Sequence, residues 1–226
     1  MASNNIKTKT TGLIIFVIIF IFFSTLNAKN LDKYNTSSKI SDYLSGSILL
    51  SQSKYSDSYK YLKKLDGLEE NHSKFSSKYL YATINSGNFN QAFNFAKKLD
   101  REQKNNFETD LVIGINHLKN SQYDLAKEYF IKAKKNNSIS VLNDYILNTL
   151  QIWSDLEEKN LEEAQLKLNQ LDNRFENLKK IQNIFLNCFF KNKDTEFLFN
   201  KLVSNEKTDF SRYNYFYAKY LDNQGK

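Results

Sequence analysis

An aromatic residue recurs at a 34-residue interval, and this spacing restricts the fold more than any other feature of the chain. Tyr55, Phe89 and Tyr123 each lie in a short polar turn, SQSKYSDS, NSGNFNQA and KNSQYDLA. An amphipathic segment with helical periodicity precedes each turn, and a second one follows it. The interval therefore predicts a series of helix-turn-helix repeats.

Small residues recur at fixed offsets from these aromatic residues. In the third repeat, Gly114 and Ala126 are small where the two helices are expected to approach each other, and Phe130 and Ala133 face inward at helical spacing. The corresponding residues of the second repeat are Gly87, Phe89, Ala92, Ala96 and Leu99, and those of the first are Gly46, Tyr55, Ser58, Leu62 and Leu65. This pattern predicts close packing within each helix pair.

The composition agrees with an all-α fold. Apolar residues make up 41% of the 226 residues, which is enough to fill a core. The chain has no proline and only 6 glycines, whereas a β-sandwich or barrel of this length needs many turns rich in both residues.

Later repeats follow the pattern more loosely. Leu161, Ala164, Leu168 and Leu171 fit a fourth second helix, but the step from Tyr123 is 38 residues. We expect the four extra residues to lengthen the helix that includes Tyr145, Leu150 and Trp153. A fifth repeat is predicted from Ile184–Phe190 and Phe197–Val203, and a helix over Ser211–Asp222 precedes a turn-like segment, Asn223–Lys226. The expected repeats lie near 39–72, 73–106, 107–140, 141–175, 176–207 and, in part, 208–226. The last helix is either a solitary cap or the start of a repeat that continues in a longer protein, and the expectation favours the second.

The N-terminus has the order of a secretory signal. Lys7 and Lys9 precede the apolar run Leu13–Phe23, which rises about 16 Å as a helix, against roughly 30 Å for a hydrocarbon core. Cleavage is expected after Ala28, although Leu26 is larger than usual for its position. Residues 1–28 are therefore a signal peptide or, alternatively, an uncleaved inner-membrane anchor facing the periplasm. Residues 29–38 are predicted to form a polar linker.

Residues from about 39 to 226 resemble the tetratricopeptide repeat (TPR) family, and the export signal makes the whole similar to secreted or periplasmic TPR proteins of Gram-negative bacteria. The resemblance implies a right-handed superhelical solenoid of antiparallel helix pairs, with about five repeats and an unpaired C-terminal helix. It also implies a concave face, lined by the first helices, that binds a peptide or a partner protein.

In register with the family, certain first-helix residues are expected on that concave face. They are Tyr43, Ser47, Lys74, Ser77, Tyr81, Asn85, Leu111, Ile115, Lys119 and Trp153, with Leu50, Ser51, Glu108 and Thr149 beside them. Tyr and Trp are favoured anchors at interfaces, but Tyr81 and Trp153 could equally pack between repeats. One subclass of the family clamps the carboxylate of chaperone tails. This ligand is disfavoured because Ser47 and Tyr81 stand where groove asparagines would be expected, and no groove arginine is present.

Residue types that support catalysis are scattered. Cys188 is the only cysteine and lies in an apolar stretch, and His72 and His117 fall in different repeats. The acidic pairs lie at turns or early in helices, and no phosphate-binding loop or nucleophile elbow is present. We therefore predict no catalytic residue, no metal site and no cofactor.

The net charge of +7 indicates an acidic partner only if the basic residues cluster. The lysines recur as pairs, mostly near helix ends, where solvated cations offset the helix dipole, and there are only three arginines. A lysine-driven binder of anionic polymer or membrane is thus the weakest hypothesis, and nucleic acid is not an expected partner. The leading hypothesis is a non-catalytic scaffold or adaptor in the bacterial envelope. The alternative is the helical-repeat segment of a larger envelope enzyme or assembly machine.

Overall fold

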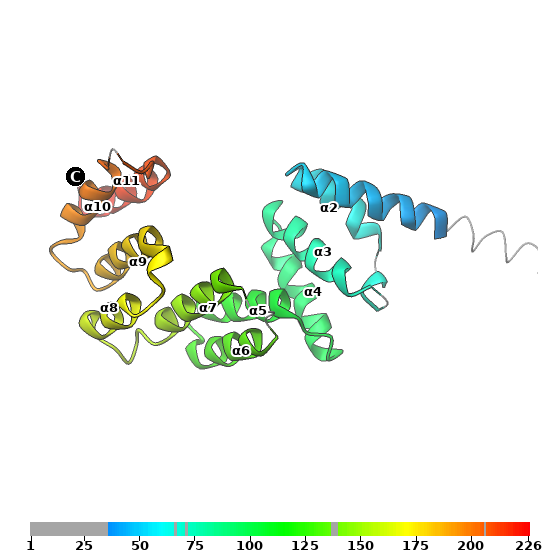
Figure 1. The fold of residues 1–226 in the computed structure, drawn as a ribbon, viewed down its shortest axis with the longest axis horizontal. Coiled ribbons are helices and arrows are strands. Elements are labelled where there is room, and N and C mark those ends of the chain that lie inside the picture. Colours follow the sequence, from blue (N-terminus) through cyan, green and yellow to red (C-terminus); the bar gives the residue numbers. More distant parts are fainter. Residues whose placement is uncertain (1–35, 66, 71, 137–139, 206) are drawn as a thin grey trace, which may run out of the picture. The chain divides into compact units, whose positions relative to one another are not determined.

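A computed structural model describes residues 36–65, 67–70, 72–136, 140–205 and 207–226, and these residues form helices and no strand. The predicted all-α class is confirmed. Residues 36–51 are helical, and the elements that follow are α2 (Tyr55–Leu62), η1 (Lys63–Leu65), η2 (Leu68–Glu70), α3 (Ser73–Asn85), α4 (Phe89–Arg101), α5 (Phe107–Lys119), α6 (Tyr123–Lys135), α7 (Val141–Ser154), α8 (Leu161–Asn169), η3 (Asn173–Phe175), α9 (Glu176–Phe189), α10 (Thr195–Val203), η4 (Ser211–Tyr213) and α11 (Asn214–Asn223) (Figure 1).

The chain divides into two compact units, one up to Ala92 and one from Phe93 to Lys226. In the first unit, α2 packs against α3. In the second, helices that are neighbours in sequence pack in turn from α5 to α11. None of the described helices combines the length and the hydrophobicity needed to cross a bilayer.

The predicted signal or anchor over residues 1–28 lies outside the described residues, as does most of the predicted linker. The linker prediction is wrong for residues 36–38, which are helical. Residues 36–41 are all exposed, so this first turn buries no apolar side chain. Composition therefore does not distinguish a polar linker from a solvated first helical turn, and this is why the linker prediction extended too far.

A left-handed residue ends the first helix of a pair at the predicted turns. Positive φ angles occur at Ser53, Gly87 and Ser121, each 34 residues after the last, and again at Lys191 and Gly225, which are also 34 apart. In each case the next amide donates to a carbonyl five residues earlier, as from Gln122 to His117 (2.9 Å). This is the Schellman arrangement, which satisfies carbonyls at the helix end. The second helices α2, α4 and α6 then begin at Tyr55, Phe89 and Tyr123, as the aromatic spacing predicts.

Close approach of α5 and α6 explains the glycine at position 114. A Cβ atom built on Gly114 would lie 2.4 Å from Cε1 of Phe130, a ring that is wholly buried with Ala126, Ala133 and Leu147. Only a residue without a side chain allows this contact. In the first unit, a Cβ on Gly46 would lie 2.7 Å from Leu62.

The second repeat corrects one predicted correspondence. Gly87 is not the counterpart of Gly114, since it has a φ of 84° in the turn after α3. The residue 34 positions before Gly114 is Leu80, which is buried on α3. Glycine at position 87 serves the left-handed backbone there and not the packing of two helices.

The irregular fourth repeat also differs from its prediction. α7 ends at Ser154 and has 14 residues, only one more than α5, so the extra residues do not mainly lengthen it. They lie instead in the connection 155–160. Leu156 of this connection is buried in a core cluster with Ile152 and Ala164. The side-chain oxygen of Asn160 accepts a hydrogen bond from the backbone N–H of Glu163 and so caps α8. Burial and capping hold these residues outside the helix.

Lysine 179 departs from the solvated role expected of the paired lysines. Its side chain is 7% exposed, and its ammonium donates to the carbonyls of Asn169 (3.4 Å) and Leu171 (3.2 Å) and to Oδ1 of Asn173 (2.7 Å). These carbonyls belong to the last residue of α8 and to the segment directly after it. Lys179 therefore joins the end of α8 to α9 in the interior.

Prediction for the α5–α6 contact. The substitution Gly114→Ala should lower the free energy of unfolding by up to about 2 kcal/mol. Overpacking against Phe130 costs about 1–3 kcal/mol, and the higher helix propensity of alanine offsets about 1 kcal/mol. In a Phe130→Ala background the same substitution should instead stabilise by about 1 kcal/mol. Urea denaturation of the four proteins measures both steps, and equal effects in the two backgrounds would contradict the contact.

Candidate functional site

The predicted first-helix residues of the first unit lie on the helix 36–51 and on α3. Lys78 joins two of them, since its ammonium donates to Oγ of Ser47 (2.9 Å) and lies 4.7 Å from the centre of the Tyr43 ring. Tyr81 is 52% exposed and meets Tyr55 edge to face. The structure therefore brings Tyr43 and Ser47 together around a lysine that the sequence did not select.

The other predicted residues of this unit contribute less. Lys74 and Asn85 are exposed and Ser77 is half-buried. The amide of Asn85 donates to the carbonyl of Tyr81 (2.8 Å), so it serves its own helix end. Tyr81 is thus the predicted anchor that has the most surface to offer in this unit.

In the second unit, most predicted residues contact the core. Leu111 and Ile115 pack against the cluster around Phe130, and Lys119 is exposed. Trp153 is half-buried against the cluster around Ile152, and its indole N–H donates to Oε1 of Gln182 (2.8 Å). Both the ring and the polar group of Trp153 therefore have partners within the chain, in line with the packing alternative for this residue.

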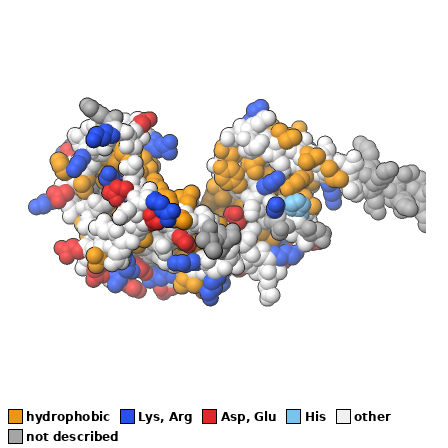
Figure 2. Space-filling view, in the orientation of Figure 1, with side chains coloured by type: hydrophobic (Ala, Val, Ile, Leu, Met, Phe, Trp, Pro, Cys, Tyr) orange, Lys and Arg blue, Asp and Glu red, His pale blue; other side chains and the backbone are white. Residues whose placement is uncertain are grey.

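Aromatic residues that the sequence did not select form an exposed surface on α9 and α11. We call it the aromatic face and define it by Phe185, Phe189, Tyr213, Tyr215 and Phe216. Phe189 is 50% exposed, Tyr215 71% and Phe216 46%. Phe216 has its ring centre 5.4 Å from that of Phe185 and 5.6 Å from that of Tyr215. Hydrophobic side chains gather along this part of the second unit in Figure 2.

The aromatic face is anchored in the core below it. Phe185 packs against the cluster of Ile181, Ile184, Phe199, Leu202 and Phe210, and its ring meets Phe199 edge to face at 6.2 Å. Tyr213 packs against the same cluster. The exposed rings are therefore held on buried ones rather than on a loop.

A sequence signal for the α9 part of this face did exist. The left-handed residues Ser121 and Lys191 show that α5 and α9 end 70 residues apart. The same step carries Ile115 to Phe185 and Lys119 to Phe189. The sequence did not show this register, because the step in the fourth repeat is 38 residues and not 34. In the structure, the turn after α7 also has no positive φ angle.

The histidine and cysteine side chains, which could support catalysis, contact other residues of the chain or are partly buried. His117 stacks on Tyr129 and its Nδ1 lies 2.6 Å from Oε1 of Gln122, while His72 contacts Tyr43. Burial raises the pKa of the Cys188 thiol, which disfavours the nucleophilic thiolate. In the described part of the chain, no three His, Cys, Asp or Glu side chains are grouped to hold a metal ion.

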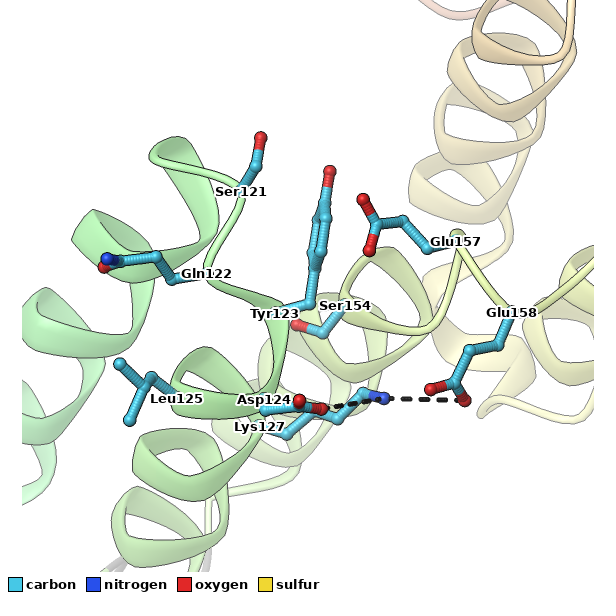
Figure 3. A pocket seen from close by; sticks show the side chains of 9 residues that line it. All are labelled: Ser121, Gln122, Tyr123, Asp124, Leu125, Lys127, Ser154, Glu157 and Glu158. Carbon is cyan, nitrogen blue, oxygen red and sulfur yellow. Dashed lines mark ion pairs between the residues drawn. The ribbon is translucent and has the colours of Figure 1, made fainter.

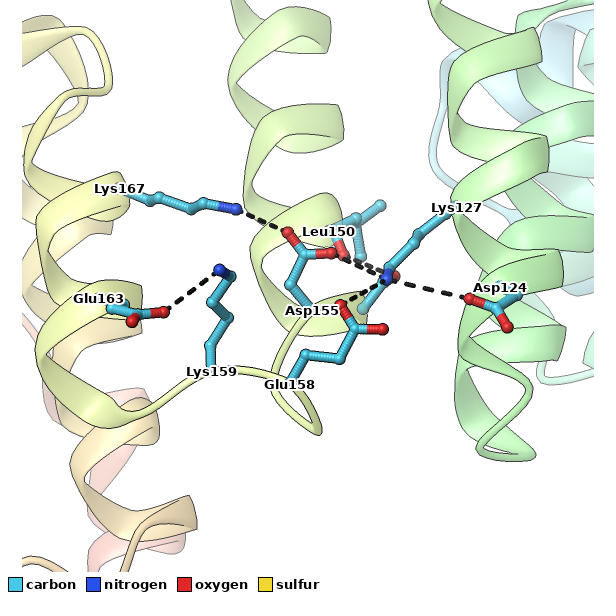
Figure 4. Close-up of polar contacts among 9 residues, drawn as sticks. Asp124, Lys127, Leu150, Asp155, Glu158, Lys159, Glu163 and Lys167 are labelled. Carbon is cyan, nitrogen blue, oxygen red and sulfur yellow. Dashed lines mark hydrogen bonds and ion pairs between the residues drawn. The ribbon is translucent and has the colours of Figure 1, made fainter.

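A charge cluster centred on Asp155 joins α6, α7 and α8 (Figure 4). The carboxylate of Asp155 lies 2.7 Å from the ammonium of Lys167 and 3.1 Å from that of Lys127. Lys127 also pairs with Glu158 (3.8 Å). Burial opposes ionisation of Asp155, but the hydrogen bonds from both lysines outweigh it and lower the pKa of this carboxyl group.

A polar pocket of about 310 Å³ lies beside this cluster and contains Tyr123, Asp124, Lys127, Glu157 and Glu158 among its lining residues (Figure 3). Lys127 reaches both Asp124 (4.0 Å) and Glu158 (3.8 Å) here. Because Lys127 already forms ion pairs with carboxylates of the chain, we assign the pocket a structural role.

Comparison of the chain with protein-family models, curated proteins and solved structures gives no match. The candidate site thus rests on its own geometry, which is an exposed aromatic surface on a packed helical support.

Prediction for the charge cluster. Asp155→Asn should lower the free energy of unfolding by roughly 1 kcal/mol at pH 7, because two lysines lose their carboxylate. The pKa of Asp155 is lowered in the folded state, so its contribution is present above the usual Asp pKa of about 3.9 and is lost as the pH falls through the folded value. Urea denaturation should therefore give a smaller difference from wild type at pH 3 than at pH 7.

The matched control for this prediction is Glu157→Gln, which removes an exposed carboxylate close in sequence with no ion pair described. It should change the stability little at either pH. A difference between wild type and Asp155→Asn that does not depend on pH would show that the ion pairs are not its source.

Proposed function

We propose that the chain is a non-catalytic scaffold of the bacterial envelope, built from TPR-like helix pairs in a right-handed solenoid, which binds a protein or peptide through its first helices. The 34-residue recurrence of the Schellman turns supports the TPR-like part of the proposal. The signal-like composition of residues 1–28 supports export to the periplasm, with an uncleaved membrane anchor as the alternative.

The observation that carries the binding role is the aromatic face. Burying a large apolar side chain contributes about 1.5–3 kcal/mol, and yet Phe189, Tyr215 and Phe216 remain about half exposed or more, with the rings of Tyr215 and Phe216 in contact. Exposed apolar patches of this kind mark interaction sites, and tyrosine is enriched among the residues that dominate binding energy. Phe216 contacts Phe185, which packs on the core beneath it, so this ring loses little conformational freedom when a partner covers it.

The first unit offers a second, smaller contact. Tyr81 of α3 is half exposed, and Lys78 of the same helix contacts Tyr43 and Ser47 of the helix 36–51. The exposed part of the Tyr81 ring offers apolar area beside polar groups, which is the combination that favours tyrosine at interfaces. We therefore propose Tyr43, Ser47 and Tyr81 as a separate, secondary contact of the first unit.

Prediction for the aromatic face. The double substitution Phe189→Ser and Tyr215→Ser should weaken binding of an envelope partner at least roughly tenfold, because central aromatic anchors each contribute about 2 kcal/mol or more. The measurement is quantitative affinity capture from envelope extract with the immobilised full chain, followed by titration of the captured partner.

The matched control is Phe197→Ser, which removes an equally exposed aromatic residue (67%) from the second helix α10. It should leave binding unchanged, and circular dichroism should show all variants folded. Equal loss with the control variant, or capture that the double variant does not reduce, would contradict binding through the first helices.

A further inference from the structure

A second cavity, of about 290 Å³, lies between α9 and α10, with Asn205 and Phe210 also among its lining residues. Its lining residues are Lys180, Asn183, Ile184, Leu198, Lys201, Leu202, Asn205 and Phe210. At 100° per residue, Lys180, Asn183 and Ile184 lie on the side of α9 opposite to Phe185 and Phe189. The cavity is therefore separate from the aromatic face.

The cavity has an apolar floor. Ile184, Leu202 and Phe210 are buried members of one core cluster, and Leu198 packs against it partly buried. A ligand that fills the cavity must therefore place an apolar body against these four side chains. The volume is at the lower end of the usual range for ligand pockets, roughly 300–1,000 Å³, so this body is small.

The rim of the cavity consists of hydrogen-bond donors. Lys180 and Lys201 are exposed, and no carboxylate pairs with either of them among the described residues. Oδ1 of Asn183 already accepts from Gln165 (2.8 Å), and Oδ1 of Asn205 accepts from the amides of Lys207 (2.9 Å) and Thr208 (3.0 Å). Both asparagines thus have their acceptor atoms occupied, and neither Nδ2 group has an acceptor within the described part of the chain.

Two ammonium groups and two amide donors above an apolar floor favour one class of ligand. We infer that this cavity binds a small carboxylate with an aliphatic body, such as a free aliphatic acid or the last residue of a peptide. A phosphate is less suited, because no arginine lines the cavity among the described residues. The inference does not depend on the proposed scaffold role, since it uses none of the aromatic face.

The test is a titration of the full chain with hexanoate, followed by NMR of the labelled methyl groups of Ile184, Leu198 and Leu202. We expect these methyl signals to shift with a Kd on the order of 1 mM, in keeping with the small size of the ligand. Hexanamide, which has the same shape without the charge, should bind at least roughly fivefold more weakly.

Variants separate the lysines of the rim from the general positive charge. Lys180→Gln and Lys201→Gln should each weaken hexanoate binding roughly threefold to tenfold. The control Lys193→Gln removes an exposed lysine outside the cavity and should change the Kd less than twofold.

A second titration distinguishes the two sources of the carboxylate, a free aliphatic acid and the last residue of a peptide. It uses N-acetyl-leucine, with the amide of N-acetyl-leucine as the uncharged control. Tighter binding of N-acetyl-leucine than of hexanoate assigns the site to a peptide end, and the reverse order assigns it to a free acid.

Three results would overturn the inference. The first is that the methyl signals of Ile184, Leu198 and Leu202 do not shift at roughly 20 mM hexanoate, 20 times the expected Kd. The others are that hexanamide binds as tightly as hexanoate, or that Lys193→Gln weakens hexanoate binding as much as Lys180→Gln and Lys201→Gln do. Capture of a partner by the aromatic face is measured separately, so the failure of one proposal leaves the other to its own result.

Discussion

The packing of the helix pairs depends on how closely two helices can approach. The Cα of Gly114 faces the ring of Phe130 at a distance that excludes any side chain. The same constraint acts on Gly46 and Leu62 in the first unit, where Ser58 replaces the alanine of the third repeat. The hydroxyl of that serine donates to the carbonyl of Gly46 (2.7 Å), so the polar atom is satisfied in a buried contact. A glycine on one helix and a large residue on the other thus set the separation of these two pairs.

The turns convert this packing into a register along the chain. Ser53, Ser121 and Lys191 adopt a left-handed conformation that costs about 1–2 kcal/mol in a residue other than glycine. The Schellman hydrogen bonds and the packed helices on either side hold them there. Because α5 and α9 end in the same way, residues at equal distances before these two turns occupy equivalent positions. This is how Phe185 and Phe189 come to stand where Ile115 and Lys119 stand two repeats earlier.

Buried polar groups join one helix pair to the next. Asp110 is wholly buried, and Asn105 links it to Asp100 through two hydrogen bonds of 2.7 Å, while Asn136 donates to its other oxygen (2.8 Å). Burial raises the pKa of Asp110, so its ionised form depends on these amides. Asp155, directly after α7, also joins neighbouring helices, with Lys127 of α6 and Lys167 of α8 as its partners. The acidic residues described here therefore serve the fold, and the surfaces left for ligands are aromatic or lysine-rich.

Sequence periodicity alone determined the all-helical class, the turns at Tyr55, Phe89 and Tyr123, and the close contact at Gly114, because each follows from local spacing and side-chain volume. It could not place the extra residues of the fourth repeat, the true counterpart of Gly114 at Leu80, or the exposure of the predicted anchors. Trp153 illustrates the reason. Its position on α7 was readable, but Gln182, 29 residues away, decides whether its indole N–H is free for a partner. The aromatic face and the lysine-rimmed cavity likewise need residues of α9, α10 and α11 to meet, and only tertiary packing brings side chains so distant in sequence together.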